Sequence, residues 1–219
     1  DLYNEGDLQQ GLKTAKLLLR EFPKSAVLYN IEGAIHASLG QFESAVESYK
    51  NAIEIKPDFV VAYNNMGNVL NEKGDIKESI ESYKKLLKIK PDYAEAYYNM
   101  GNALHSKGDL DAAIESYKKA VNFKPDYAEA YYNMGLVFKI KGDLEETIKS
   151  YKKALQVKPD YALAHNNMGA ALQEKGNLDL AIKSYKKAIK IKPDFAEAYN
   201  NMGNAQKDKG NFEKAIKSY

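Results

Sequence analysis

The tripeptide Lys-Pro-Asp recurs five times in this sequence at a constant spacing of 34 residues. The residues between the copies are also similar each time, and the copies begin at Lys56, Lys90, Lys124, Lys158 and Lys192. A repeat of this length is typical of paired helices that stack side by side into a solenoid. Because each repeat packs only on its neighbours, a solenoid offers a long surface to a partner rather than a closed pocket to a substrate.

The segment 94–127 shows what one repeat contains. In its first half, apolar and small residues from Ala94 to Leu104 fall on one side of a helix with about 3.6 residues per turn. In its second half, the residues from Leu110 to Val121 do the same. Each repeat therefore predicts two amphipathic helices, and the whole chain predicts an all-α fold.

Glycine and proline mark the predicted helix ends. A glycine lies where the first helix should end in a left-handed residue, and Asp or Asn follows it in all repeats but one, as an N-cap. These glycines are Gly6, Gly40, Gly74, Gly108, Gly142, Gly176 and Gly210. Each second helix should end before a proline, at Pro57, Pro91, Pro125, Pro159 and Pro193. The pairs Asp75 with Glu78 and Asp143 with Glu146 have capping-box spacing.

A second set of glycines lies inside the first helices, at Gly67, Gly101, Gly135, Gly169 and Gly203. Glycine there costs about 1 kcal/mol relative to alanine, so we expect a close approach of the paired helices as compensation. Small residues of the second helices, such as Ala113 and Ala120, favour that approach. We expect large side chains to fill the gaps between neighbouring pairs, namely Tyr83, Tyr117, Tyr151 and Tyr185.

Composition excludes several classes of function. The net charge of +2 is far from the basic composition of a dedicated nucleic-acid binder, so no nucleic-acid partner is expected. Residues 1–110 carry −3 and residues 111–219 carry +5, which we interpret as drift in a solvated surface. The absence of cysteine excludes disulfides and thiolate chemistry and favours a reducing compartment, the cytoplasm. No signal peptide or long apolar run is found, so no membrane partner is expected.

These residues closely resemble the tetratricopeptide repeat: an aromatic, a large apolar residue and glycine, then a small residue, an aromatic, a second small residue and a proline. The resemblance covers the whole chain and implies a right-handed superhelical solenoid of antiparallel helix pairs. It divides one array into full repeats at 26–59, 60–93, 94–127, 128–161 and 162–195, with partial repeats at 1–25 and 196–219. Glu32 replaces the large apolar residue of the first full repeat. Because the chain lacks an initiator Met and begins and ends within a repeat, we expect a fragment of a longer protein.

The polar side of the first helices repeats asparagine. The row comprises Asn65, Asn99, Asn133, Asn167 and Asn201, with Asn64, Asn166 and Asn200 one residue earlier and Asn68, Asn102 and Asn204 three residues later. Asparagine in mid-helix is roughly several tenths of a kcal/mol worse than Lys or Glu, so helix stability does not explain it. Its amide both donates and accepts, which matches the main chain of an extended peptide. We predict a peptide-binding row, with Tyr98 and Tyr132 as apolar contacts on the same face.

The asparagine row resembles the repeat domain of O-linked N-acetylglucosamine transferases, in which similarly placed asparagines hold the backbone of protein substrates. The resemblance implies that the first helices line a concave groove and that the partner is a protein or peptide in an extended conformation. On this interpretation the chain is a non-catalytic scaffold, such as the substrate-recruiting arm of a glycosyltransferase or of another enzyme outside this segment. The structural alternative is that the amides hydrogen-bond sideways and only tie neighbouring repeats together.

Catalytic and metal-binding patterns are not found. His36, His105 and His165 fall at different repeat positions without metal-ligand spacing, and His165 replaces the repeat aromatic. No enzyme activity, cofactor or metal is therefore expected. The second helices carry paired lysines that favour a solvated face, namely Lys84, Lys85, Lys118, Lys119, Lys152, Lys153, Lys186 and Lys187.

The second candidate function is self-association through uncapped repeat ends. Phe212, Ala215, Ile216 and Tyr219 have no following repeat in this sequence to cover them. Burial of apolar surface stabilises a contact by about 25 cal/mol per Å², before the costs of association. We therefore expect these residues to lie in contacts between molecules.

Overall fold

The computed structural model describes residues 5–218, and these form thirteen α-helices with no β-strand among them. The first helices of the repeats are α2 (Ala26–Ser38), α4 (Val60–Lys73), α6 (Ala94–Lys107), α8 (Ala128–Ile140), α10 (Ala162–Glu174) and α12 (Ala196–Asp208). The second helices are α1 (Glu5–Glu21), α3 (Phe42–Ile55), α5 (Ile76–Ile89), α7 (Leu110–Phe123), α9 (Leu144–Val157), α11 (Leu178–Ile191) and α13 (Phe212–Ser218). The predicted all-α fold is confirmed.

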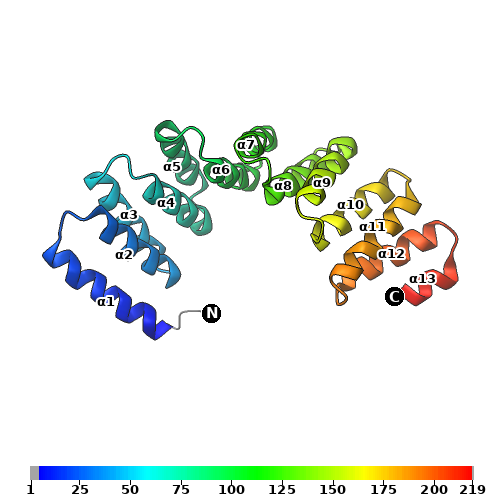
Figure 1. The fold of residues 1–219 in the computed structure, drawn as a ribbon, viewed down its shortest axis with the longest axis horizontal. Helices are drawn as coiled ribbons and strands as arrows, with labels where there is room; N and C mark the ends of the chain where they lie inside the picture. The colour runs from blue at the N-terminus through cyan, green and yellow to red at the C-terminus, as the bar shows by residue number, and fades with distance from the viewer. Residues whose placement is uncertain (1–4, 219) are drawn as a thin grey trace. The chain divides into compact units, whose positions relative to one another are not determined.

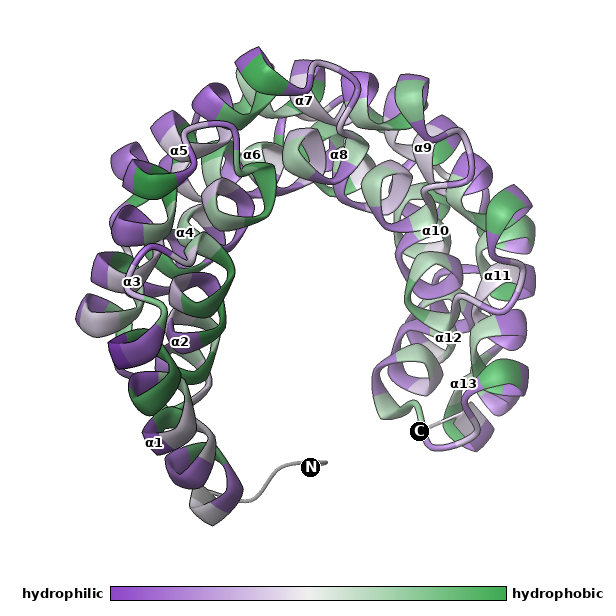
Figure 2. Cartoon of the chain, turned by 60° about the vertical axis from the view of Figure 1, so that its left-hand side comes forward, coloured by the Kyte–Doolittle hydropathy of each residue, from purple (hydrophilic) through white to green (hydrophobic). Residues whose placement is uncertain are grey.

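The helices belong to two compact units, one ending at Asp109 and the other beginning at Leu110. Unit 1 contains α1 to α6, and unit 2 contains α7 to α13 (Figure 1). Within each unit, consecutive helices pack against each other, and α4 also contacts both α2 and α6, as α12 contacts α10. Hydrophobic and hydrophilic segments alternate along the helices, as expected of amphipathic helices with one buried side (Figure 2).

The turns within the pairs follow the predicted chemistry at most positions. Six glycines have φ between 69° and 94°, the left-handed region that a side chain disfavours: Gly40, Gly74, Gly108, Gly142, Gly176 and Gly210. Gly6, in contrast, lies within α1 and does not end a helix. Asp143 caps α9 by accepting from the Glu146 N–H at 3.1 Å. The capping-box prediction is wrong for Asp75, whose carboxylate instead pairs with Lys73 at 3.0 Å.

The recurring Lys-Pro-Asp tripeptide forms the turn after each second helix. In every copy the lysine ammonium lies over the ring of the aromatic residue that follows Asp, at 4.5 to 5.5 Å from the ring centroid. Such a cation–π contact contributes about 0.5–1 kcal/mol at an exposed site. The conserved spacing of lysine, proline and aromatic residue within this one chain therefore has a local structural cause, independent of any partner.

The glycines inside the first helices face tyrosine rings. A Cβ on Gly67 would lie 2.6 Å from the Tyr83 ring, and a Cβ on Gly169 would lie 2.6 Å from the Tyr185 ring. The close approach predicted for these glycines is therefore present. The predicted place of the tyrosines is corrected, because each ring first fills the space inside its own helix pair. Tyr185 also belongs to a core cluster that includes Met202 of α12, so it reaches the next pair as well.

The last helix of the described chain leaves apolar side chains uncovered. Phe212 is 64% exposed and Ile216 is 75% exposed, as predicted for an end without a following repeat. Ala215 is only 3% exposed, so the prediction that it is uncovered is wrong, because this side of α13 packs on α12. Tyr219 lies outside the described residues. Contact between molecules through this end stays a prediction.

Candidate functional site

The asparagines of the first helices form lateral links between neighbouring repeats. In unit 1, the Asn65 Nδ2 donates to Asn30 Oδ1 at 3.1 Å. The Asn99 Nδ2 lies 3.3 Å from Asn64 Oδ1 and 3.1 Å from Asn68 Oδ1. Asn68 Oδ1 also accepts from the Tyr83 hydroxyl at 2.6 Å, so the polar row is tied to the core tyrosine beneath it. The amides of unit 1 thus link α2 to α4 and α4 to α6.

Unit 2 repeats the links with one change of residue type. The Asn201 Nδ2 donates to Asn166 Oδ1 at 3.1 Å, and Asn166 Nδ2 donates to Glu197 at 2.9 Å. The Asn167 Nδ2 donates instead to the Tyr132 hydroxyl at 2.9 Å. The lateral links join residues 35 positions apart, one more than the repeat length. Each donor therefore reaches the residue just before the equivalent asparagine of the preceding repeat.

Two predicted peptide contacts are buried acceptors rather than exposed groups. Asn64 is 6% exposed and Asn166 is 1% exposed, and each accepts from the asparagine 35 residues later. In this conformation their amides are used within the protein, so direct binding of a peptide by these two is not supported. The pairing was not predicted residue by residue, although the spacing of Asn64 and Asn99 was a usable signal. The structural alternative for the asparagines is thus present.

The other predicted asparagines remain reachable. Asn68 and Asn200 are exposed, and the rest of the row is half-buried, namely Asn65, Asn99, Asn102, Asn133, Asn167, Asn201 and Asn204. A side-chain amide has two donor hydrogens and an oxygen that accepts twice, so a lateral bond through Nδ2 leaves the oxygen able to accept. For Asn65 and Asn201 the lateral bond uses only Nδ2. Such oxygens can receive an N–H from a bound main chain.

The two predicted aromatic contacts, Tyr98 and Tyr132, are both half-buried. Tyr132 packs against other rings, with its centroid 4.9 Å from that of Tyr161 and 5.7 Å from that of Tyr151. Burial is the main cause that raises the pKa of Tyr132, with a further contribution from Glu197. Packing against these rings and the hydrogen bond from Asn167 therefore occupy much of the Tyr132 side chain. The part that stays exposed can contact a ligand.

The histidines have structural surroundings. His36 is buried and its Nδ1 lies 2.6 Å from Gln41 Oε1, whereas His165 is buried with Nε2 3.0 Å from the Pro159 carbonyl oxygen. Burial is the main cause that lowers the pKa of His165. Over residues 5–218, no group of three His, Cys, Asp or Glu side chains could hold a metal ion. In the same part of the chain, no helix is long and apolar enough to cross a membrane.

Antiparallel helix pairs with a fixed sequence period and a polar row on one helix of each pair define a helical repeat protein. The sequence pattern of the TPR repeat matches residues 33–71, 67–107, 101–141, 137–176 and 172–210. The chain therefore belongs to the tetratricopeptide repeat (TPR) family. Proteins of this family are generally non-catalytic scaffolds for contacts between proteins.

Solved structures agree with this assignment. MamA is 32% identical, with a TM-score of 0.70, over 75% of this chain and 96% of that chain. YrrB, described as a TPR protein with an unusual peptide-binding site, is 25% identical, with a TM-score of 0.68, over 84% of this chain and 95% of that chain. PilF of Pseudomonas aeruginosa shares the fold, with a TM-score of 0.75 at 18% identity over 88% of each chain. A search of curated proteins finds no significant match.

Proposed function

We propose that this protein is a scaffold that binds an extended segment of a partner protein along the first-helix face of its units. The observation that carries the proposal is the order of the amides. Lateral bonds hold Asn65, Asn99, Asn167 and Asn201 in fixed orientations. The oxygens of Asn65 and Asn201 can still accept. A pre-ordered polar row costs less side-chain entropy on binding than freely rotating groups do.

The periodicity of the row suits main-chain recognition. Packed helices lie about 8–10 Å apart, and an extended strand advances about 3.3 Å per residue, so one amide set serves about every third residue. Main-chain hydrogen bonds do not depend on the partner's side chains. The similarity to YrrB, whose description includes a peptide-binding site, supports the same class of ligand. In a narrower form of the proposal, the protein is the substrate-recruiting arm of an enzyme and lies in the cytoplasm. The absence of cysteine favours that location.

The lateral hydrogen bonds of the asparagines determine how the asparagine row can be tested. If the row only bound peptide, replacing Asn99, Asn133 and Asn167 with Ala would leave stability unchanged, because alanine favours helix. Asn99 and Asn167 donate lateral bonds, so each should now cost stability on replacement. Binding must therefore be measured per folded molecule, at a temperature well below the unfolding transition.

We would select binders from a random peptide library and measure their affinity by calorimetry. The triple variant Asn65→Ala, Asn99→Ala and Asn201→Ala should lose about 1 kcal/mol of binding free energy for each amide contact. A triple variant of exposed second-helix lysines, Lys84→Ala, Lys85→Ala and Lys118→Ala, is the matched control. Equal affinity of the two variants for the selected peptides would contradict the proposal.

Self-association is the second candidate function. The specific observation in its favour is the exposure of Phe212 and Ile216 on α13. Sedimentation of the wild-type chain and of the variant Phe212→Ser with Ile216→Ser tests it. A concentration-dependent dimer that the variant loses would support this function, and a monomer at all concentrations would reject it.

A further inference from the structure

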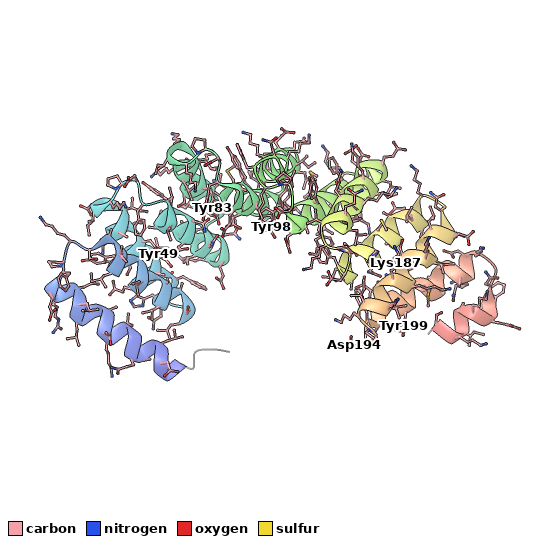
Figure 3. The ribbon with its side chains drawn as sticks, viewed as in Figure 1. Tyr49, Tyr83, Tyr98, Lys187, Asp194 and Tyr199 are labelled. Atoms are coloured by element: carbon pink, nitrogen blue, oxygen red, sulfur yellow. The ribbon has the colours of Figure 1, made fainter. Side chains whose placement is uncertain are left out.

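A basic groove lies on the second-helix side of unit 2. Two adjoining hollows of about 370 and 260 Å³ share the side chains of Lys152 and Gln156. Their floor includes the apolar Ile148 and Met168, and Lys187 lies at the far side. We call these two hollows together the lysine groove. Lys187 on α11 and the surrounding side chains can be followed in Figure 3.

The lysines of the groove differ in what they contact. Lys149 pairs with Glu146 at 2.7 Å, and Lys175 pairs with Glu145 at 2.8 Å. Within residues 5–218, no carboxylate pairs with Lys152, Lys153 or Lys187, although all three are exposed. Three ammonium groups of the groove therefore have no ion-pair partner among these residues, although Glu145, which pairs with Lys175, also lines it.

The equivalent groove of unit 1 provides an internal comparison. It is lined by Val46, Lys50, Met66 and Lys85, which stand three repeats before Ile148, Lys152, Met168 and Lys187. The walls of the unit 1 groove also contain Glu78 and Glu81, and the Glu81 carboxylate accepts from Lys84 at 2.8 Å. The apolar floor and two lysines are thus common to both grooves. The unit 1 groove is lined by three lysines and two acids, Glu78 and Glu81, whereas the lysine groove is lined by five lysines and one acid, Glu145.

The charge differs at several equivalent positions of the two units. Four acidic residues of unit 1 are replaced at the equivalent positions of unit 2: Glu47 by Lys149, Glu54 by Gln156, Glu78 by Leu180 and Glu81 by Lys183. At two other equivalent positions the change runs the other way, from Ser44 to Glu146 and from Lys77 to Asp179. The lining of the lysine groove is nevertheless the more basic of the two. The net charges of the two halves, −3 and +5, reflect this difference in part.

The groove also contains an unused polar atom. His165 lines it and is 5% exposed, where the equivalent residue of unit 1 is Tyr63. Its Nε2 must donate to the Pro159 carbonyl oxygen at 3.0 Å, which leaves Nδ1 as an acceptor, and Nδ1 has no hydrogen-bond partner. Because this nitrogen has almost no exposed surface, a ligand in the groove does not reach it, and the proposal does not depend on it.

We propose that the lysine groove binds an acidic segment of a polypeptide. Carboxylates of the segment pair with Lys152, Lys153 and Lys187, and its apolar side chains lie on the floor formed by Ile148 and Met168. The partner is a polypeptide rather than a nucleic acid, because the groove joins an apolar floor to a few cations and has no arginine or exposed aromatic stack. This surface is separate from the first-helix face.

The test uses the full chain and a fluorescein-labelled peptide of repeated Leu-Glu-Glu triplets, with fluorescence anisotropy as the readout. The variant Lys152→Glu with Lys187→Glu should weaken binding about tenfold or more, and added salt should weaken binding to the wild type. The matched control is Lys50→Glu with Lys85→Glu, the same two changes at the equivalent positions of unit 1. Equal loss of affinity in both variants would overturn the proposal, because the charge effect would not be local.

A transfer experiment tests the same proposal by gain of binding. In the chain that carries Lys152→Glu and Lys187→Glu, the changes Glu47→Lys, Glu54→Gln and Glu81→Lys should restore peptide affinity through unit 1. No recovery in a chain of native helicity would contradict a role for the groove charges. The proposal is also overturned if inorganic phosphate competes as well as the peptide, or if sedimentation shows that a second copy of the chain occupies the groove. Variants of the asparagine row should leave this binding unchanged. A failure of the lysine-groove proposal is therefore distinguishable from a failure of the first-helix proposal.

Discussion

Unit 1 and unit 2 have similar cores but differ in the ion pairs that join neighbouring repeats at the surface, which we call the edge of each unit. In both units a buried tyrosine ring faces a glycine, as in Tyr83 with Gly67 and Tyr185 with Gly169. The edge of unit 2 carries three ion pairs between residues 30 apart, namely Lys141 with Asp111, Lys175 with Glu145 and Lys209 with Asp179. Unit 1 has one pair at this spacing, Lys73 with Glu43 at 3.2 Å.

The difference shows which positions the fold requires. The core pairs stay the same because a changed volume there would strain closely packed helices. The edge pairs vary because exposed ion pairs contribute little, about 0–1 kcal/mol each. The asparagine row recurs in both units, so a function of the row is expected to be common to them, whereas a function of the lysine groove is expected in unit 2 alone.

The largest expected effect is unfolding at alkaline pH, and it should affect both units alike. Burial raises the pKa of Tyr49 and of Tyr185 to about 12, and it also raises the pKa of Tyr83 and Tyr151 above the usual 10. The unfolded chain loses these protons first, so this stability is complete below pH 10 and declines as the pH rises toward 12. Each tyrosine should cost about 1 kcal/mol at pH 11.

Circular dichroism and absorbance at alkaline pH measure this effect together. The control is Tyr151→Phe, which removes a titrating hydroxyl that is buried without a hydrogen-bond partner. This variant should be at least as stable at neutral pH and more stable than the wild type at pH 11, by about 1 kcal/mol. If Tyr49, Tyr83, Tyr151 and Tyr185 ionised near pH 10 while the helices persisted, the burial of these four side chains would be contradicted.

The second effect comes from overfilling the core. Alanine at Gly67 or at Gly169 places Cβ 2.6 Å from a buried ring, so each variant should lose about 2 kcal/mol in urea unfolding despite better helix propensity. The control is Gly11→Ala in α1, where the added Cβ would lie 3.5 Å from Ile35 Cδ1. This variant should gain up to about 1 kcal/mol of stability from its better helix propensity. Unequal losses in the two units would break the claim that their cores are equivalent.

The third effect concerns the buried amides. Asn166→Ala leaves Asn201 and Glu197 without their partner, so it should cost about 1–3 kcal/mol. Asn64→Ala in unit 1 should cost less, because Asn99 keeps its second acceptor, Asn68. Thermal melting of both variants ranks their losses of stability. The control is Asn200→Ala at an exposed position, which should gain roughly a few tenths of a kcal/mol of stability from helix propensity. A smaller loss for Asn166→Ala than for Asn64→Ala would reverse the comparison.

The smallest effect is the repair of the edge of unit 1. Lys107 stands at the lysine position of this spacing, but the residue 30 positions earlier, where the pair needs an acid, is Lys77. The change Lys77→Glu should therefore stabilise the chain by about 0.3–1 kcal/mol at low salt, and the gain should disappear at high salt. The converse change in unit 2, Glu145→Lys, should destabilise by a similar amount. A salt-independent result in either variant would exclude an ion-pair effect.

The sequence by itself determined the elements of this protein. The spacing of Lys-Pro-Asp and of the turn glycines predicted where the helices begin and end, because left-handed glycine and proline act within a few residues of the chain. The capping-box prediction failed at Asp75 because a nearby cation competes for its carboxylate. Lys73 pairs with Asp75 and also with Glu43 of the preceding repeat, and the sequence pattern does not encode that competition.

The tertiary structure alone decided what the repeated side chains do. The sequence showed that asparagine recurs, but only helix packing brings Asn99 to Asn64 and buries Asn166, because the contact depends on the offset between neighbouring helices. In the same way, the lysines of the second helices look alike in sequence. Their position over an apolar floor, with two acids in the lining of unit 1 and one in the more basic lining of unit 2, follows from which helices pack together.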